Sequence, residues 1–107
     1  MNKYTELSDL EINKRVFVAA KIEHEDTDLH SNKVFYGDGA RWIEFSPCNN
    51  PSDAMPIIVE NEISIIKSSG GWMCCHGSVG QVERESLYRG AMELFLMMKD
   101  AERETNT

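Results

Sequence analysis

A long apolar stretch near the C-terminus, residues 86–101, constrains the fold of this chain more than any other segment. Its apolar side chains recur at the spacing of an α-helix, and Ser86 is placed to cap the first turn. On an ideal helix the apolar arc covers roughly 220°, about twice the stripe of a helix that packs on one surface. We therefore expect a core helix that is covered on more than one side. The apolar positions are Leu87, Tyr88, Ala91, Met92, Leu94, Phe95, Met97, Met98 and Ala101.

The remaining side of this helix is predicted to face water. Its charged residues are Arg89, Glu93, Asp100 and Arg103. Leu96 interrupts that polar side, and two alternatives are open for the surplus apolar surface of Met92, Leu96 and Met97. Either two other helices cover it, or it is an exposed interaction surface through which two copies of the chain associate weakly.

Two further helices are predicted from their start signals. Ser8 and Glu11 form a capping box, so a helix is expected to begin after Ser8 and to end near residue 20 or 21. Asn50 followed by Pro51 is typical of a second helix start, with Asn as the cap and Pro in the first turn. This shorter helix is expected to stop at Asn61, a residue type that tolerates left-handed backbone.

Short segments with the composition of β-strands pair into two predicted hairpins, each closed by a glycine-containing turn. The first hairpin joins residues 34–36 to 41–45, and the second joins 63–67 to 72–76.

The connections between these elements are polar or glycine-rich. Residues 23–33 are expected to form an exposed loop, and residues 77–80 a flexible join before the last helix. The order of patterns predicts an α+β fold with three helices and a small, mainly antiparallel sheet that contains 63–67 and 72–76. A chain of 107 residues is the size of one domain, so we treat 1–107 as a single domain.

Composition excludes several classes of partner. The formal net charge of −7 disfavours binding to a phosphate backbone, so no direct contact with nucleic acid is expected. No apolar run has the length of a membrane span, and the first residues lack the apolar core of a signal peptide. We therefore expect a cytoplasmic protein that does not contact a membrane.

Three cysteines and one histidine are the candidate chemical groups: Cys48, Cys74, Cys75 and His76. Thiolate and imidazole suit zinc, but neighbouring residues on a strand point to opposite faces, and no second ligand pair completes four ligands. Cys74 and His76 share a face, which leaves a nucleophilic cysteine with a histidine base open as an alternative to buried thiols. No metal, no other cofactor and no catalytic residue is predicted.

Three segments of the chain together resemble one family of phage proteins. They are residues 4–14 (YTELSDLEINK), 48–58 (CNNPSDAMPII) and 88–98 (YRGAMELFLMM), and in this order they are similar to the NinX-type proteins of lambdoid phages. The resemblance implies a phage or prophage origin, a small accessory gene product, and a sandwich of helix, sheet and helix layers. It implies no activity, so no catalytic residue is carried over. The positions most similar to the family are Asn49, Asn50, Asp53, Pro56 and Trp72, which we interpret as cap, turn and core residues.

Three functional hypotheses follow, in order of preference. The first is a non-enzymatic module that binds another phage or host protein in the bacterial cell. The second is an acidic mimic that occupies a nucleic-acid-binding protein, which the negative charge favours. The third is a small enzyme that uses Cys74 or Cys75 with His76.

Overall fold

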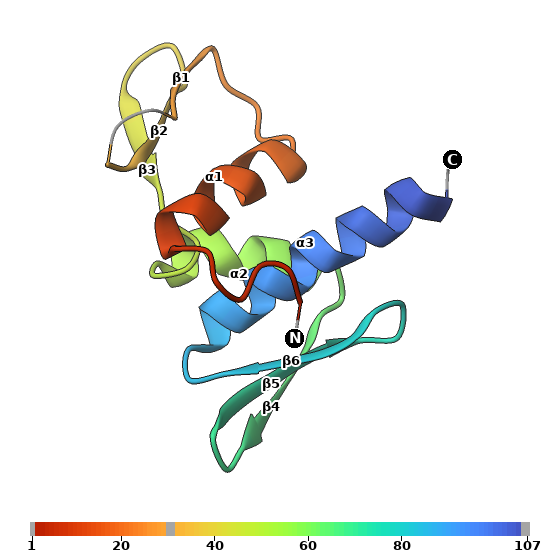
Figure 1. The fold of residues 1–107 in the computed structure, drawn as a ribbon. Coiled ribbons are helices and arrows are strands. Elements are labelled where there is room, and N and C mark those ends of the chain that lie inside the picture. Colours follow the sequence, from red (N-terminus) through yellow and green to blue (C-terminus); the bar gives the residue numbers. More distant parts are fainter. Residues whose placement is uncertain (1, 30–31, 106–107) are drawn as a thin grey trace.

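A computed structural model describes residues 2–29 and 32–105 of the chain. The described part contains three α-helices and six β-strands, which confirms the predicted α+β class (Figure 1). In chain order the elements are α1 (Asp9–Ala19), β1 (Asp26–Asp28), β2 (Val34–Gly37), β3 (Trp42–Phe45), α2 (Pro51–Glu60), β4 (Ser64–Ser68), β5 (Gly71–His76), β6 (Gly80–Arg84) and α3 (Leu87–Thr105).

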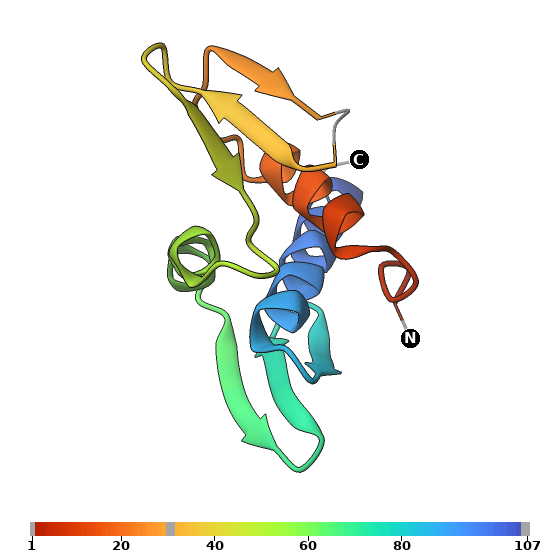
Figure 2. The same cartoon turned by 90° about the vertical axis from the view of Figure 1, so that its left-hand side faces the viewer.

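The described strands form two separate antiparallel sheets rather than one. The N-terminal sheet has the order β1-β2-β3, and the C-terminal sheet has the order β4-β5-β6. Figures 1 and 2 show the sheets at opposite ends of the molecule, with the helices between them. The layer order therefore differs from a helix–sheet–helix sandwich, because α2 follows β3 and leads the chain away from the first sheet before β4 begins.

Two strands lie where the sequence analysis predicted no strand. β1 falls within the expected loop 23–33 and pairs with β2, with Thr27 opposite Tyr36. β6 follows the expected join and pairs with β5, with Val82 opposite Cys74. β1 is exposed or half-exposed throughout, and β6 buries only Val82. Such strands need no alternation of apolar and polar residues, so their sequences lack the pattern of a half-buried strand.

The predicted helix starts are confirmed at the level of hydrogen bonds. The hydroxyl of Ser8 accepts from the amide of Glu11 at 3.1 Å, and the side chain of Asn50 accepts from the amide of Ser52 at 3.0 Å. The predicted stop of α2 is wrong in its detail. Asn61 has a negative φ of −96°, and its amide group donates to the carbonyl of Ile57, while Glu62 takes the left-handed conformation with φ 55°.

α3 is the central helix, as the breadth of its apolar arc predicts. It contacts α1, α2, β5 and β6, so neighbours cover it on several sides. It continues to Thr105, beyond the apolar stretch of residues 86–101 that predicted it. Its fully or nearly fully buried apolar residues are Ala91, Met92, Leu94, Phe95, Leu96 and Met98.

The N-terminal sheet attaches to the helices through aromatic rings. Phe17 of α1 packs against Tyr36 of β2 and Phe45 of β3, with ring centroids 5.7 and 5.6 Å apart. Phe17 and Phe45 are 2% and 4% exposed, and Val34 beside them is 1% exposed. This cluster is continuous with the core around α3, so the described part of the chain has one connected core.

Two glycines of the C-terminal sheet allow a matched test of this packing. Gly71 and Gly80 both have positive φ, 141° and 95°. A Cβ added at Gly71 would lie 2.3 Å from the carbonyl oxygen of Arg84, whereas a Cβ at Gly80 would meet no described atom within 4 Å. We expect Gly80→Ala to lower the free energy of unfolding by about 1 kcal/mol and Gly71→Ala by about 3 kcal/mol. Urea denaturation measures both values, and equal losses would contradict the close approach of β5 and β6.

Candidate functional site

The carboxylate of Glu93 is completely buried, although the sequence placed it on the wet side of α3. Arg84 of β6 donates to it from Nε and Nη2 at 3.1 and 2.8 Å, and Arg89 donates from Nε at 2.7 Å. Asn2 adds a fourth hydrogen bond at 3.1 Å. The part of the polar side of α3 at Arg89 and Glu93 is thus an internal ion network, whereas the Arg103 side chain is 78% exposed.

Both arginines continue from Glu93 to the N-terminal segment. Arg84 donates from Nη2 to the hydroxyl of Thr5 at 2.8 Å. Arg89 donates from Nη2 to the carbonyl oxygens of Tyr4 and Leu7, at 2.9 and 2.7 Å, and pairs with Asp9 at the start of α1. The network therefore cross-links the chain before α1 to β6 and α3.

The ionisation of Glu93 follows from these contacts. Burial acts to raise the pKa of Glu93, because a charge is poorly solvated inside a protein. The hydrogen bonds from Arg84, Arg89 and Asn2 outweigh burial and hold the pKa below its ordinary value. Glu93 is therefore ionised at neutral pH and acts as a structural anion, with its hydrogen-bond acceptors already occupied.

A second buried polar group holds the segment between β3 and α2. Asn13 of α1 is 5% exposed and accepts a hydrogen bond from the amide of Cys48 at 3.0 Å. The amide of Ser46 donates to Asp53 at 2.9 Å, and its hydroxyl accepts from Asn13 and from Asn49, both at 3.3 Å. These contacts agree with the cap and turn roles interpreted for Asn49 and Asp53.

The structure buries most of the apolar surface that α3 was predicted to expose. Met92 is 0% exposed, Leu96 is 4% exposed, and Met97 is half-buried. α1 and α2 contact α3, so of the two alternatives open at the level of sequence the structure favours coverage by other helices. The burial of Met92 and Leu96 removes the exposed patch on which weak self-association was predicted, and self-association itself stays an untested prediction.

Cys48 and Cys74 are buried thiols, and His76 contacts a serine. Cys74 is completely buried and its thiol lies 3.5 Å from the carbonyl oxygen of Leu87. Burial raises the pKa of Cys74 to about 11 and that of Cys48 to about 12. The Nδ1 atom of His76 contacts the hydroxyl of Ser78 at 2.8 Å instead. Within residues 2–29 and 32–105, no three metal-ligating side chains are grouped to hold an ion.

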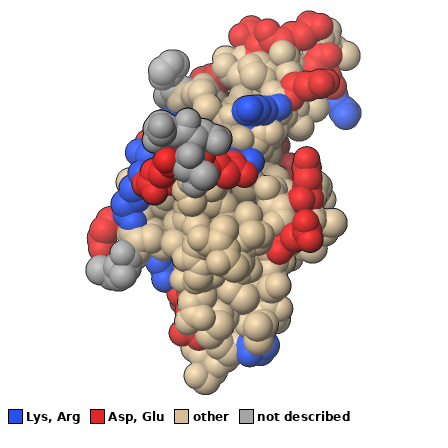
Figure 3. All heavy atoms as spheres, turned by 90° about the vertical axis from the view of Figure 1, so that its right-hand side faces the viewer, with Lys and Arg blue, Asp and Glu red and all other residues tan. Residues whose placement is uncertain are grey.

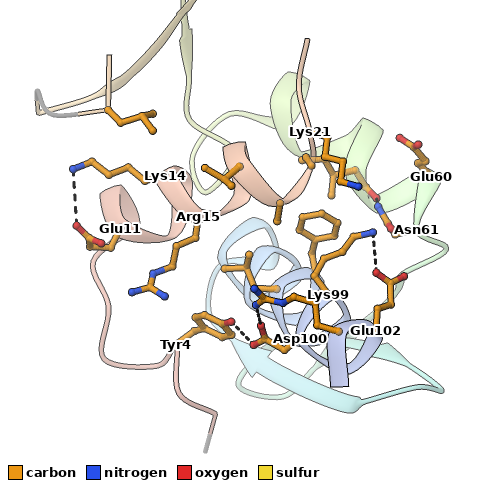
Figure 4. A pocket seen from close by; sticks show the side chains of 18 residues that line it. Tyr4, Glu11, Lys14, Arg15, Lys21, Glu60, Asn61, Lys99, Asp100 and Glu102 are labelled. Atoms are coloured by element: carbon orange, nitrogen blue, oxygen red, sulfur yellow. Dashed lines mark hydrogen bonds and ion pairs between the residues drawn. The ribbon is translucent and has the colours of Figure 1, made fainter. Parts of the chain in front are cut away.

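Residues of the three helices line an open cleft with a volume of about 930 Å³ (Figure 4). Its apolar lining includes Ile57, Phe95 and Leu96, which are almost completely buried, and Val18, which is 64% exposed. Its rim is charged, with five basic and four acidic side chains among the described residues. The basic ones are Lys14, Arg15, Lys21, Lys99 and Arg103, and the acidic ones are Glu11, Glu60, Asp100 and Glu102.

Asp100, on the rim of this cleft, is hydrogen-bonded and ion-paired to several side chains. Tyr4 donates its hydroxyl to Asp100, which also pairs with Lys3 at 3.2 Å and Arg103 at 2.5 Å. Burial acts to raise the pKa of Asp100, but these hydrogen bonds hold it below its ordinary value, and burial raises the pKa of Tyr4 to about 12. Tyr4 is therefore a neutral donor that fixes the N-terminal segment against α3.

The outer face of α2 is apolar as well as its inner face. Ala54, Ile57 and Ile58 are buried, whereas Met55 and Val59, one turn apart, are 40% and 68% exposed. Pro56 lies beside Met55 and is also exposed, so these three apolar residues form one exposed group, with exposed Ser52 and Glu60 at its ends. The sequence alone does not indicate this exposed group, because apolar residues cover both faces of the helix.

Figure 3 shows how the charged side chains lie on one face of the molecule. In the view of Figure 3, acidic and basic groups surround a broad uncharged area, and red groups are concentrated toward the end that holds the N-terminal sheet. None of the helices in the described ranges is long and apolar enough to cross a membrane.

Thiol labelling tests the assignment of the cysteines. At neutral pH we expect a mild alkylating reagent to modify Cys75 before Cys48 and Cys74 in the native protein, because only Cys75 is partly exposed. All three should react at similar rates in denaturant, which serves as the control. Fast labelling of Cys74 in the native protein would contradict its burial and restore the cysteine-enzyme hypothesis.

The comparisons with known proteins agree with the resemblance seen in the three segments. No curated protein and no solved structure matches the chain. The family described as bacteriophage P22, NinX, matches residues 3–99, which include all three helix starts and both described sheets. The chain therefore belongs to the bacteriophage P22 NinX family.

Proposed function

We propose that this phage accessory protein is a non-enzymatic module that binds another phage or host protein through the outer face of α2. The observation that carries the proposal is the exposed, uncharged stripe of Met55, Pro56 and Val59. Contiguous exposed apolar surface costs solubility, so it is retained chiefly where a partner covers it. An unbranched side chain such as that of Met55 adapts readily to a partner surface.

The neighbouring strand extends this surface. β4 follows α2 and is an edge strand of the C-terminal sheet. Figure 2 shows both elements on the same side of the molecule. Ile66 of β4 is 54% exposed and lies opposite Met73 of β5, so their side chains share the face of the sheet opposite to Cys74. A partner that covers α2 can therefore also contact apolar groups of β4.

The family membership supports an accessory role, and the chemistry of the described residues supports binding over catalysis. Glu93 has its acceptors occupied by the network, and the buried thiols of Cys48 and Cys74 have raised pKa values. A nucleophilic cysteine needs the opposite, a lowered pKa and a nearby base.

The acidic-mimic hypothesis is the second candidate. Exposed carboxylates of the N-terminal sheet and its connections support it: Glu23, Glu25, Asp26, Asp38 and Glu44. This group lies at the other end of the molecule from the C-terminal sheet (Figure 1), so the two candidates use different surfaces.

A matched pair of variants tests the proposed surface. Val59 and Val18 are 68% and 64% exposed, and both are valines on helices, so Val18→Lys is a control for Val59→Lys. In pull-downs from infected cells, wild-type protein and Val18→Lys should recover the same partner. Val59→Lys should bind it at least about tenfold more weakly, the loss typical of a central interface residue.

Two outcomes decide against the proposal. One is equal recovery of the partner with Val59→Lys and wild type. The other is binding that is lost steeply as salt is raised and is insensitive to Val59→Lys, which would favour the acidic mimic. Circular dichroism of both variants checks that each is folded.

A further inference from the structure

The N-terminal sheet packs on α1 with one of its two faces. On that face Tyr36 of β2 and Phe45 of β3 contact the ring of Phe17. Side chains alternate between the two faces of a strand, so Phe35 and Trp42 lie on the opposite face. Figures 1 and 2 show this sheet beyond α1, at one end of the molecule.

The strand register surrounds these two aromatic residues with carboxylates. Asp26 is opposite Gly37, which is opposite Trp42, so the three residues form one row across the sheet. A Cβ added at Gly37 would lie 3.8 Å from the Cβ of Asp26, so the Asp26 side chain begins on this face. The next row holds Asp28, Phe35 and Glu44. We call this surface, made of the two rows, the Trp42 face.

Trp42 is more exposed than its side chain normally is. It is 55% exposed, whereas the large ring of tryptophan is highly buried in most proteins. Phe35 on the next row is half-buried, and Asp26, Asp28 and Glu44 are exposed. An accessible tryptophan is the residue type most typical of the centre of a protein interface.

The charge of this end of the molecule is one-sided. Residues 22–46 contain six acidic and two basic residues, which give −4 of the formal net charge of −7. The two basic residues, Lys33 and Arg41, are each already paired with an exposed carboxylate. Among the residues that the structure describes, Glu23, Glu25 and Asp26 form no ion pair. Figure 3 shows acidic groups concentrated toward this end.

We propose that the Trp42 face binds an arginine-rich segment of another protein. One guanidinium group stacks on the ring of Trp42 and donates to the carboxylate of Asp26, and further arginines meet the remaining acidic residues. Arginine fits better than lysine, because its planar group both stacks on an aromatic ring and binds carboxylates with two donors. Alternate residues of an extended segment are about 7 Å apart, which is the spacing of the two rows.

This interaction deepens the acidic-mimic candidate, because it gives the basic partner a defined contact. It is independent of the surface on α2, which lies outside the N-terminal sheet. The aromatic ring distinguishes it from general attraction between opposite charges, which needs no stacking surface.

Titration of the full chain with a labelled peptide of alternating arginine and serine tests the proposal, followed by anisotropy of the label and by tryptophan fluorescence. We expect saturable binding that weakens as salt is raised. The same peptide with lysine in place of arginine should bind about threefold more weakly. The chain has two tryptophans, so the peptide should still change the emission of Trp72→Phe but no longer that of Trp42→Phe.

Matched variants assign the contacts. Trp42→Ser should weaken peptide binding about tenfold, whereas Val18→Ser, which changes an equally exposed apolar residue on α1, should leave it unchanged. Asp26→Asn should weaken binding about threefold, the effect of one exposed charge. Glu83→Gln removes an exposed carboxylate from β6, an edge strand of the other sheet, and should have no effect. Circular dichroism checks that each variant is folded.

Four results would overturn the proposal. They are absence of saturable binding, equal affinity of Trp42→Ser and wild type, equal weakening by Asp26→Asn and Glu83→Gln, and equal affinity for the lysine peptide. Val59→Lys should bind the arginine peptide as tightly as wild type, which separates this experiment from the test of the α2 surface.

Discussion

The buried carboxylate of Glu93 is the constraint on which the arrangement of this protein depends. Burying an ionised carboxylate costs several kcal/mol, which only well-aligned partners offset. Arg84, Arg89 and Asn2 supply those partners from three places in the chain, and the arginines then bind the segment before α1. Because movement of these partners removes hydrogen bonds from a buried charge, the network favours one mutual arrangement of the N-terminal segment, β6 and α3.

Local signals in the sequence predict much of this fold, and long-range pairings account for what they miss. The Ser8 cap, the Asn50 cap and the hairpin of β4 and β5 involve residues close in the chain, and all three predictions are confirmed. The burial of Glu93 depends on Asn2, 91 residues away, so its spacing on α3 resembles that of a solvent-exposed residue. β1 likewise exists through its backbone pairing with β2 and has no apolar pattern of its own.

The candidate sites show the same division between local pattern and tertiary arrangement. The breadth of the apolar arc on α3 correctly predicts that several elements cover this helix. It does not predict which of the other helices has exposed apolar residues. On α2, Val59 is exposed, whereas Ile57 and Ile58 are buried. The cleft could not be predicted at all, because its lining comes from all three helices and forms only once they are packed.

The free energy of unfolding of wild type and of Glu93→Gln, measured from pH 7 to strongly acidic pH, tests the central role of this carboxylate most directly. The pKa of Glu93 is lower in the folded protein than in the unfolded chain, where it is about 4.3. Ionised Glu93 therefore stabilises the fold fully above the unfolded pKa. This stabilisation is lost as the pH falls through the folded pKa. We expect the variant to be less stable by about 3 kcal/mol at pH 7, and the difference to vanish in acid once Glu93 is protonated. A small difference that does not change with pH would contradict the role of Glu93 as the anion that orders the fold.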